Sequence, residues 1–256
     1  MKKIKIANFS QTRLPDKIKN VELAEQFEVH DVSSSDPQEI LLMDYDVIEI
    51  LPEDFELFKT HIKAVDWRTN VVGIADAFIL TEGKYKPANL LIDAVSNIIK
   101  LNRNMINSQL PVIVIGEYHF VFSMCAKLAM SGFVEIIFSL SDSKLEMAEL
   151  IENKLKSFVF DLNIRFVNVN ELTTSELVGS LLISDFKKNL NIEAYELLTY
   201  FNFLSGGALF IDCNSIRDGF LVEDARKAEI AVIDEEEVIT QKYLLLLEKL
   251  KISPKV

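Results

Sequence analysis

The stretch Leu110-Pro-Val-Ile-Val-Ile-Gly116 decides the fold class of this 256-residue chain. Its four consecutive β-branched residues indicate a strand that is buried on both faces, which is typical of parallel sheets. A helical pattern follows from about Val121 to Met130 and ends at Ser131-Gly132. The next strand pattern, Phe133–Ser139, completes a βαβ unit, and such units have right-handed crossovers.

The rest of the C-terminal half repeats this alternation of strands and helices. Ser143-Lys-Leu-Glu146 is a capping box that predicts the start of a helix. Further strands are predicted at Arg165–Val169, at Gly179–Asp185 and, after a turn at Ser205-Gly206-Gly207, at Ala208–Asp212. Strands that are separated by helices predict an α/β protein with a Rossmann-like, doubly wound parallel sheet.

The N-terminal half has the pattern of a second, smaller α/β domain. Its predicted strands are Lys3–Ala7, Phe27–Asp31 and Tyr45–Leu51, with a hairpin around Thr81-Glu82-Gly83. Its predicted helices are Asp16–Phe27, Glu53–Val65 and Asn89–Asn102. A mostly polar stretch, Asn102–Gln109, follows the last of these helices. We therefore predict one domain at residues 1–102 and a second at residues 103–256, both near the usual domain size.

The charge balance is acidic, because 27 Lys and Arg residues stand against 39 Asp and Glu residues, a formal net charge of −12. A chain with this charge repels nucleic acid and anionic membranes, and no basic patch in the sequence offsets it. Two cysteines and three widely separated histidines exclude a disulfide scaffold and predict no metal site. With neither a signal-peptide pattern nor an apolar run of about 18 residues, we expect a soluble cytoplasmic protein that is monomeric or homodimeric.

The turn after the decisive strand reads Gly116-Glu117-Tyr118-His119. A dinucleotide-binding turn needs small residues, because backbone N–H groups approach the pyrophosphate there. Only the first glycine is present; Tyr118 occupies the point of closest approach, and Glu117 adds a negative charge beside it. Two interpretations stay open: a nucleotide site of altered type, or a plain βα connection that has lost phosphate binding, which we favour.

Several short segments fall in one order along nearly the whole chain. They are Thr12 and Pro15 after the first strand, Pro52 after the third, Gly73-Ile-Ala-Asp76, Asn89 at a helix start, and Gln241 near the C-terminus. In this order the chain resembles the shikimate dehydrogenase family, including its quinate-using relatives. The resemblance implies a substrate-binding domain, then a Rossmann domain, then C-terminal helices that return toward the first domain.

The resemblance also implies which side chains would meet a substrate, and two decisive ones differ. Asp54 stands where the family has its catalytic lysine, and Leu91 stands where it has its catalytic aspartate. In the family, this pair handles the proton of a ring hydroxyl while hydride passes to a nicotinamide. The other matched positions of the substrate pocket are Ser10, Thr12, Asp76, Asn89 and Gln241.

Because the proton-handling pair and the glycine turn are both changed, we predict a pseudoenzyme that has lost NADP-dependent dehydrogenase activity and needs no cofactor. Its role would be to bind a ligand or a partner. Asp54 and Asp76 would place two carboxylates in a pocket built for an anion, which suits a small cationic or polyhydroxyl molecule or a hard metal ion. A solvated groove between the domains is the alternative interpretation of the same residues.

A second hypothesis keeps the activity. The chain would then be an NAD(P)-dependent oxidoreductase of the shikimate or quinate type, with rearranged catalytic groups and NADP as its cofactor. Asp93 would replace the aspartate, and the lysine would be one of Lys59, Lys84 and Lys86.

A third hypothesis is a partner-binding protein, because aromatic residues are enriched at interfaces. The chain has 17 phenylalanines and the apolar runs Tyr200–Leu204 and Leu244–Leu247. The same runs also fit a buried core.

Overall fold

Two sheets form from the strand patterns of the chain, one in each of two units. The first unit comprises Met1–Ala94 together with Ile239–Val256, and the second comprises Val95–Val238. The computed structural model describes residues 3–9, 23–32, 36–62, 74–140, 145–185, 196–214 and 220–251. The predicted domain boundary at residue 102 stays a prediction.

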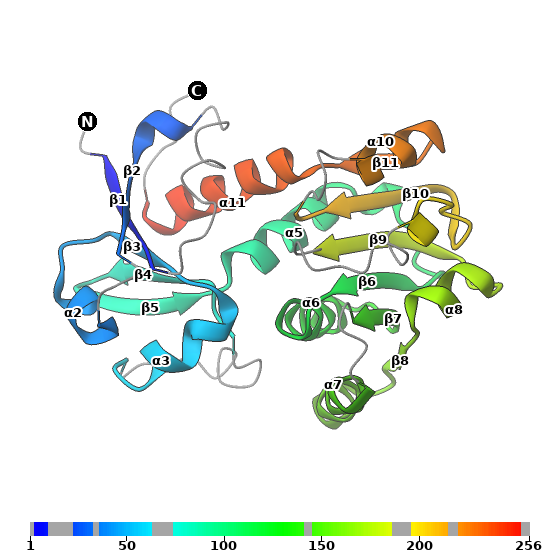
Figure 1. Ribbon diagram of the computed structural model, residues 1–256, viewed down its shortest axis with the longest axis horizontal. Coiled ribbons are helices and arrows are strands. Elements are labelled where there is room, and N and C mark those ends of the chain that lie inside the picture. The colour runs from blue at the N-terminus through cyan, green and yellow to red at the C-terminus, as the bar shows by residue number, and fades with distance from the viewer. Residues whose placement is uncertain are drawn as a thin grey trace. The chain divides into compact units, whose positions relative to one another are not determined.

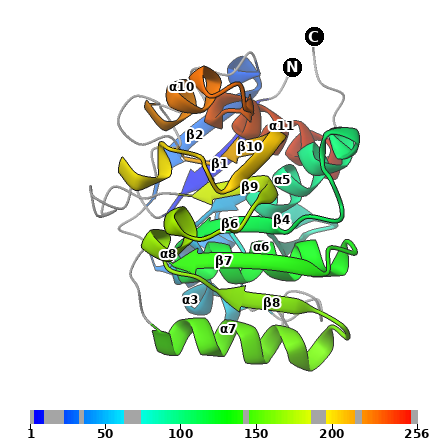
Figure 2. The same cartoon turned by 90° about the vertical axis from the view of Figure 1, so that its right-hand side faces the viewer.

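The sheet of the second unit is built around the decisive stretch, which forms β6 (Val112–Gly116). Its order is β11-β10-β9-β6-β7-β8, and every neighbouring pair is parallel. Figure 2 shows β10, β9, β6, β7 and β8 side by side in this order. The other strands are β7 (Glu135–Leu140), β8 (Asn163–Phe166), β9 (Gly179–Asp185), β10 (Leu204–Asp212) and β11 (Ala231–Ile233). The chain starts at the centre, runs to one edge, returns and continues to the other, so the predicted doubly wound sheet is confirmed.

Helices cover both faces of this sheet. Alternate residues of a strand point to opposite sides, and all residues of β6 are buried, so both faces need cover. Ile113 and Ile115 of β6 belong to an apolar core that includes residues of α8 (Val169–Thr174) and α10 (Phe220–Lys227). Two further helices pack on this sheet. The helix α6 (Tyr118–Met130) packs against β6 and β7, and α7 (Leu145–Phe158) packs against β8.

Two predictions in this unit are wrong in their details. Ser205-Gly206-Gly207 lies inside β10 rather than in a turn, and the pairing of β10 with β9 shifts its register between Leu204 and Leu209. Val169 begins α8 instead of ending a strand, because the side chain of Asn168 caps the helix by accepting a 2.8 Å hydrogen bond from the N–H of Glu171.

The sheet of the first unit has the order β2-β1-β3-β4-β5 (Figure 1). Its strands are β1 (Ile4–Asn8), β2 (Phe27–Asp31), β3 (Val47–Glu49), β4 (Ala77–Thr81) and β5 (Lys84–Ala88). The first three are parallel, and the last two form the predicted antiparallel hairpin. The N-terminal α/β domain expected from the sequence is therefore present as a mixed sheet.

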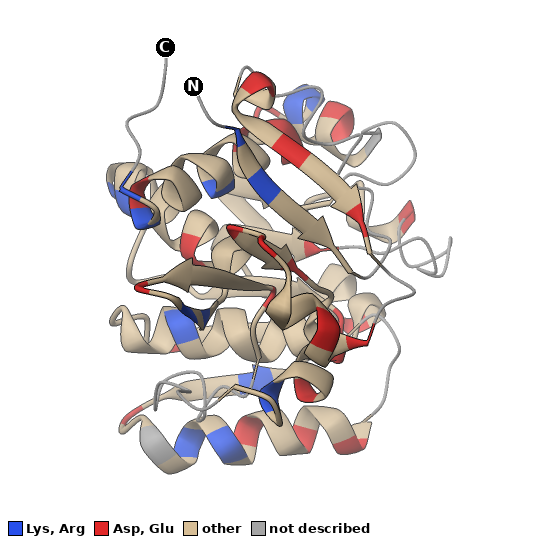
Figure 3. Cartoon of the chain, turned by 90° about the vertical axis from the view of Figure 1, so that its left-hand side faces the viewer, with Lys and Arg blue, Asp and Glu red and all other residues tan. Residues whose placement is uncertain are grey.

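Helices from distant parts of the chain cover this sheet. Ile6 and Val47 share one apolar cluster with Tyr243, Leu246 and Leu247 of α11 (Glu235–Lys249). On the other face, Ile48 and Phe78 pack with Ile40 of α2 (Pro37–Leu42) and with Phe55 and Phe58 of α3 (Phe55–Lys59). Figure 3 shows Lys and Arg positions interspersed with Asp and Glu positions along the described strands and helices.

The helix expected at Glu53–Val65 is shorter in the structure. A 3₁₀ turn at Pro52–Asp54 leads into α3, which ends at Lys59, and Thr60 follows it. The helix α2 was not predicted, although Asp36 caps it by accepting a hydrogen bond from Gln38 N–H and Pro37 begins it. The helix from Asn89 to Asn102 is confirmed as α5 (Leu90–Leu101).

Some predicted features lie outside the described residues. They are most of the helix Asp16–Phe27 together with Ser10, Thr12, Pro15, Gly73 and Ser143.

Candidate functional site

A lysine meets a buried carboxylate in the interior of the first unit. Nζ of Lys242, on α11, lies 3.1 Å from Oε2 of Glu49, the last residue of β3. The hydroxyl of Tyr243 donates a 3.1 Å hydrogen bond to Oε1 of the same carboxylate. The side chains of Glu49 and Lys242 are only 4% and 13% exposed, so the pair is largely removed from water.

Asp76 adds a second buried carboxylate, and the backbone of α5 binds it. Its Oδ1 accepts a 2.6 Å hydrogen bond from the N–H of Leu90, and its Oδ2 accepts a 2.8 Å bond from the N–H of Leu91. These N–H groups belong to the first turn of α5, where the helix dipole also favours a negative charge. Asp76 therefore caps the helix. We call Glu49, Asp76, Lys242 and Tyr243 the buried charge cluster.

The groups of the buried charge cluster shift one another's ionisation. Burial by itself lowers the pKa of Lys242, but the carboxylates of Glu49 and Asp76 raise it, and the net pKa lies above its usual value. Burial raises the pKa of Asp76, against the charge of Lys242 and the N–H of Leu91. Burial and the neighbouring Glu49 also raise the pKa of Tyr243 well above its usual value. Lys242 is thus a cation and Tyr243 a neutral hydrogen-bond donor at neutral pH.

The remaining candidates of the first unit lie on several elements. Asp54 is half-buried in the 3₁₀ turn before α3. Asn89 directly precedes α5, and Leu91 lies in the first turn of that helix, so Asp76 meets the segment that carries both. Gln241 is half-buried on α11, one residue before Lys242. Ser10 and Thr12 lie outside the described residues.

The lysines that the sequence offered as catalytic replacements lie on the surface of elements of the first unit. Lys59 pairs with Glu56 at 3.0 Å and Lys86 pairs with Glu82 at 3.4 Å, each within its own stretch of chain. Lys84 is exposed. Asp93, offered as the aspartate, lies 3.4 Å from Lys249 of α11.

Lys242 was missed, and a signal for it exists in the sequence. Val238, Lys242 and Leu246 are spaced by four residues, so they follow one face of α11, and Val238 and Leu246 are fully buried. A lysine in the middle of a buried stripe requires a buried partner. Glu49, the acid in the otherwise apolar strand Val47-Ile-Glu49, is that partner.

The glycine turn of the second unit is a single-residue connection. Gly116 ends β6, Glu117 has extended backbone, and Tyr118 begins α6. A Cβ on Gly116 would lie 3.0 Å from the carbonyl oxygen of Asp185 and 3.0 Å from Cδ1 of Phe120. Close packing of β9 and α6 therefore favours glycine at this position, with or without a phosphate nearby.

Bulky side chains occupy the positions where a dinucleotide-binding turn has its second and third glycines. Tyr118 is half-buried, and its ring stacks on Phe122 with centroids 6.1 Å apart and an interplanar angle of 9°. The imidazole of His119 contacts the ring of Tyr118 edge-on. Val121, also on α6, is fully buried. These residues do not fit the close approach of backbone to a pyrophosphate that a nicotinamide dinucleotide needs.

The described residues contain no group of three or more His, Cys, Asp or Glu side chains placed to hold a metal ion. Burial raises the pKa of the Cys125 thiol, which disfavours its nucleophilic thiolate form. No helix in the described ranges combines the length and the apolar character needed to cross a bilayer.

Comparison with known proteins gives a fold and no close sequence relative. No family model matches the sequence, and no curated protein matches it. Solved structures do match. The quinate dehydrogenase from Corynebacterium glutamicum in complex with NAD has a TM-score of 0.76 at 11% identity, over 99% of this chain and 95% of that chain. The shikimate 5-dehydrogenase from Listeria monocytogenes in complex with shikimate and NAD has a TM-score of 0.70 at 13% identity, over 96% of this chain and 91% of that one.

A third match carries a different activity. The 5-ketofructose reductase of a Gluconobacter strain has a TM-score of 0.71 at 12% identity, over 100% of this chain and 95% of that chain. The resemblance to shikimate and quinate dehydrogenases that the sequence predicted is thus confirmed for the fold. Because one fold hosts several activities, the activity of this chain has to be argued from its own residues.

Proposed function

We propose that this chain keeps the two-domain fold of the shikimate and quinate dehydrogenases without nicotinamide-dependent dehydrogenation, and that it acts as a binding protein. The observation that carries the proposal is the connection from β6 to α6. It is one residue long, and the two later glycines of a dinucleotide-binding turn are replaced by Tyr118 and the buried Val121. Glu117 adds a carboxylate where a pyrophosphate would bring further negative charge.

The first unit supports the same conclusion from the side of proton chemistry. Asp54 and Leu91 replace the lysine and aspartate that the resemblance implies. The ammonium of Lys242 is engaged by Glu49, and both oxygens of Asp76 are engaged by α5. Groups held in this way join elements of the fold, whereas a general acid or base needs access to the substrate proton.

Coenzyme-linked assays test the proposal directly. We expect no change in NADH or NADPH absorbance with shikimate, quinate or 5-ketofructose as substrate, and no saturable heat when NAD or NADP is titrated into the protein. The positive control is an active shikimate dehydrogenase in the same buffer. Micromolar affinity for either coenzyme, or steady turnover of any of the three substrates, would contradict the proposal.

One observation favours a second candidate function, an active oxidoreductase with relocated catalytic groups. Lys242 belongs to the buried charge cluster and lies beside carboxylates, and 13% of its side chain is still exposed to solvent. If turnover is found, Lys242→Met should abolish it, whereas Lys249→Met on the same helix should not. Turnover that survives Lys242→Met in a folded protein would exclude this candidate.

A further inference from the structure

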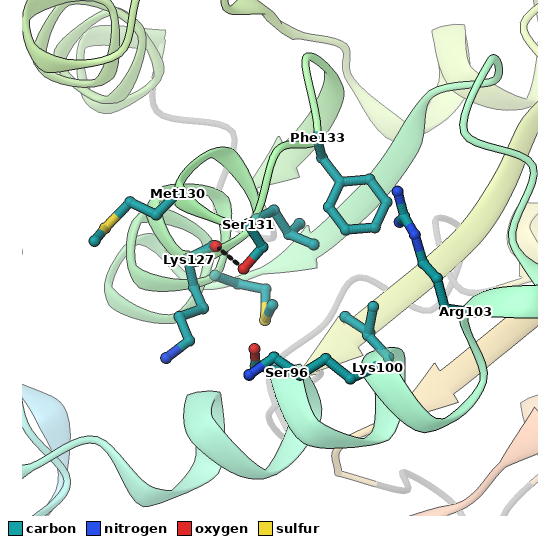
Figure 4. A pocket seen from close by; sticks show the side chains of 10 residues that line it. Ser96, Lys100, Arg103, Lys127, Met130, Ser131 and Phe133 are labelled. Carbon is teal, nitrogen blue, oxygen red and sulfur yellow. Dashed lines mark hydrogen bonds between the residues drawn. The ribbon is translucent and has the colours of Figure 1, made fainter.

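A cationic pocket lies in the second unit, at the far end of α6 from the glycine turn. It encloses about 460 Å³ and is lined by α5, by the 3₁₀ turn Arg103–Met105, by the last turns of α6 and by Phe133 (Figure 4). The twelve steps from Tyr118 to Met130 place it roughly 18 Å from that turn at about 1.5 Å per residue. Its volume is typical of small-molecule sites, which span about 300–1,000 Å³.

The rim of this pocket is positively charged. Lys100, Arg103 and Lys127 line it, and no Asp or Glu among the described residues does, in a chain whose net charge is −12. Within the part of the chain that the structure describes, Lys100 and Arg103 form no salt bridge. A cation near the last turn of a helix interacts favourably with the helix dipole. This interaction accounts for one basic residue at the end of each helix. Lys100 and Arg103 beside one cavity also create a positive potential that attracts an anion.

The floor of the pocket is apolar and closely packed. Ile99, Met124, Leu128 and Phe133 are each less than 9% exposed. The guanidinium carbon of Arg103 lies 4.2 Å from the ring centroid of Phe133, a cation–π contact that orients the guanidinium beside the cavity. Figure 4 shows the hydroxyl of Ser96 and the ammonium groups of Lys100 and Lys127 around the same space. The arrangement thus offers an apolar surface and charged donors to one molecule.

We propose that this pocket binds a small aromatic carboxylate, with its ring on the apolar floor and its carboxylate between Arg103 and Lys100. A guanidinium binds a carboxylate through two parallel N–H groups, and the Phe133 contact holds it ready for this. Met124 and Phe133 suit an aromatic ring, because a thioether and an aromatic face both contact π systems favourably. The site is separate from the glycine turn, so it does not depend on the absence of dehydrogenase activity.

Calorimetry with three probes tests the proposal on the full chain. 2-Naphthoate carries ring and charge, 2-naphthamide carries the ring alone, and inorganic phosphate carries charge alone. We expect saturable binding of 2-naphthoate, at least tenfold weaker binding of 2-naphthamide and of phosphate, and weakening of the naphthoate signal at high salt. Equal binding of 2-naphthoate and 2-naphthamide, binding of phosphate alone, or no heat with millimolar 2-naphthoate would overturn the proposal.

Variants locate the binding. Arg103→Met and Lys100→Met should each weaken 2-naphthoate by about tenfold, and Ser96→Leu, which fills the cavity while keeping the rim charges, should remove binding. The charge-matched control is Lys156→Gln on α7, whose lysine pairs with Glu152 at 3.0 Å on the surface; it should leave the affinity unchanged. A circular dichroism melt of each variant checks folding. Unchanged affinity in folded Arg103→Met and Ser96→Leu would place the ligand elsewhere and refute the proposal.

Discussion

The two units treat their charges in opposite ways. In the first unit, Glu49 and Lys242 are buried and bind each other, and Asp76 is buried against the backbone of α5. In the second unit, Lys100 and Arg103 are exposed at the rim of a cavity that no acid of the described part of the chain lines. Charges that satisfy one another inside a protein hold its elements together, whereas charges left at a cavity rim are available to a ligand. We therefore expect the first arrangement to contribute to stability and the second, as proposed above, to ligand binding.

The sharpest way to break this contrast is Lys242→Met. The variant leaves Glu49 buried without its cation, and breaking a buried pair costs on the order of 3–5 kcal/mol. We expect a loss of that size in the free energy of unfolding, measured by urea denaturation. Lys249→Met, which removes an exposed partner of Asp93 on the same helix, should cost at most about 1 kcal/mol.

A double variant then tests whether the ion pair of Lys242 with Glu49 accounts for this loss of stability. Lys242→Met with Glu49→Leu removes both charges, so it should recover part of the stability that Lys242→Met loses, because Glu49 is no longer a buried charge without its cation. The recovery should be incomplete, because the hydroxyl of Tyr243 loses its acceptor and Asp76 loses the neighbouring charge of Lys242. If the double variant is no more stable than the single one, the ion pair does not account for the loss.

The interior of the second unit depends on close packing, which Gly116→Ala tests. The new Cβ would meet the backbone of Asp185 and the ring of Phe120, each at 3.0 Å. We expect overpacking to cost about 1–3 kcal/mol in urea unfolding. The control is Gly206→Ala, since nothing lies within 4 Å of a Cβ there; equal losses in the two variants would show that packing at Gly116 is not the reason.

Asp76→Asn probes the cap of α5 and its pH dependence. Losing one carboxylate oxygen from the cap should cost about 1 kcal/mol. Burial raises the pKa of Asp76 above 3.8, so its contribution to stability is full below pH 3.8 and falls as pH rises through the folded-state pKa. The difference in unfolding free energy between wild type and variant should therefore be larger at about pH 4 than at about pH 7. A difference that grows with pH would show that the folded state instead favours the charged carboxylate.

The smallest effect is expected at the rim of the cationic pocket. Lys100 is exposed and forms no ion pair among the described residues, so Lys100→Gln should change the free energy of unfolding by no more than about 0.5 kcal/mol. A thermal melt and a urea titration measure this. A loss above 1 kcal/mol, on the order of a buried contact, would give this lysine a structural role and weaken the contrast between the units.

The sequence predicted the architecture better than its irregular parts. The run Val112–Ile115 is apolar along its whole length, and the strand Gly179–Asp185 has an apolar centre at Leu181–Ile183, so burial of both faces could be inferred without knowing their neighbours. The start of β10 was misassigned, because two glycines in a row have the same pattern in a turn and in an irregular strand. The helix α2 is six residues long, too short for its period to emerge.

The candidate sites show where single-sequence reasoning stops. Asp76 and Gln241 were selected from a resemblance, which gives positions but not partners. The pair of Lys242 with Glu49 joins residues 193 positions apart, and nothing local to either residue specifies the other. The cationic pocket depends on how the C-terminal ends of α5 and α6 meet, whereas periodicity predicts only which face of each helix is apolar.

The helix α11 has a consequence for how the protein is made. It covers one face of the first sheet with Tyr243, Leu246 and Leu247, although β1 to β5 leave the ribosome well before it does. While the second unit is being translated, that face lacks these three side chains, and exposed apolar surface is what aggregates and what chaperones bind. The first unit thus receives the last residues of this apolar cluster only after the second unit has been synthesised.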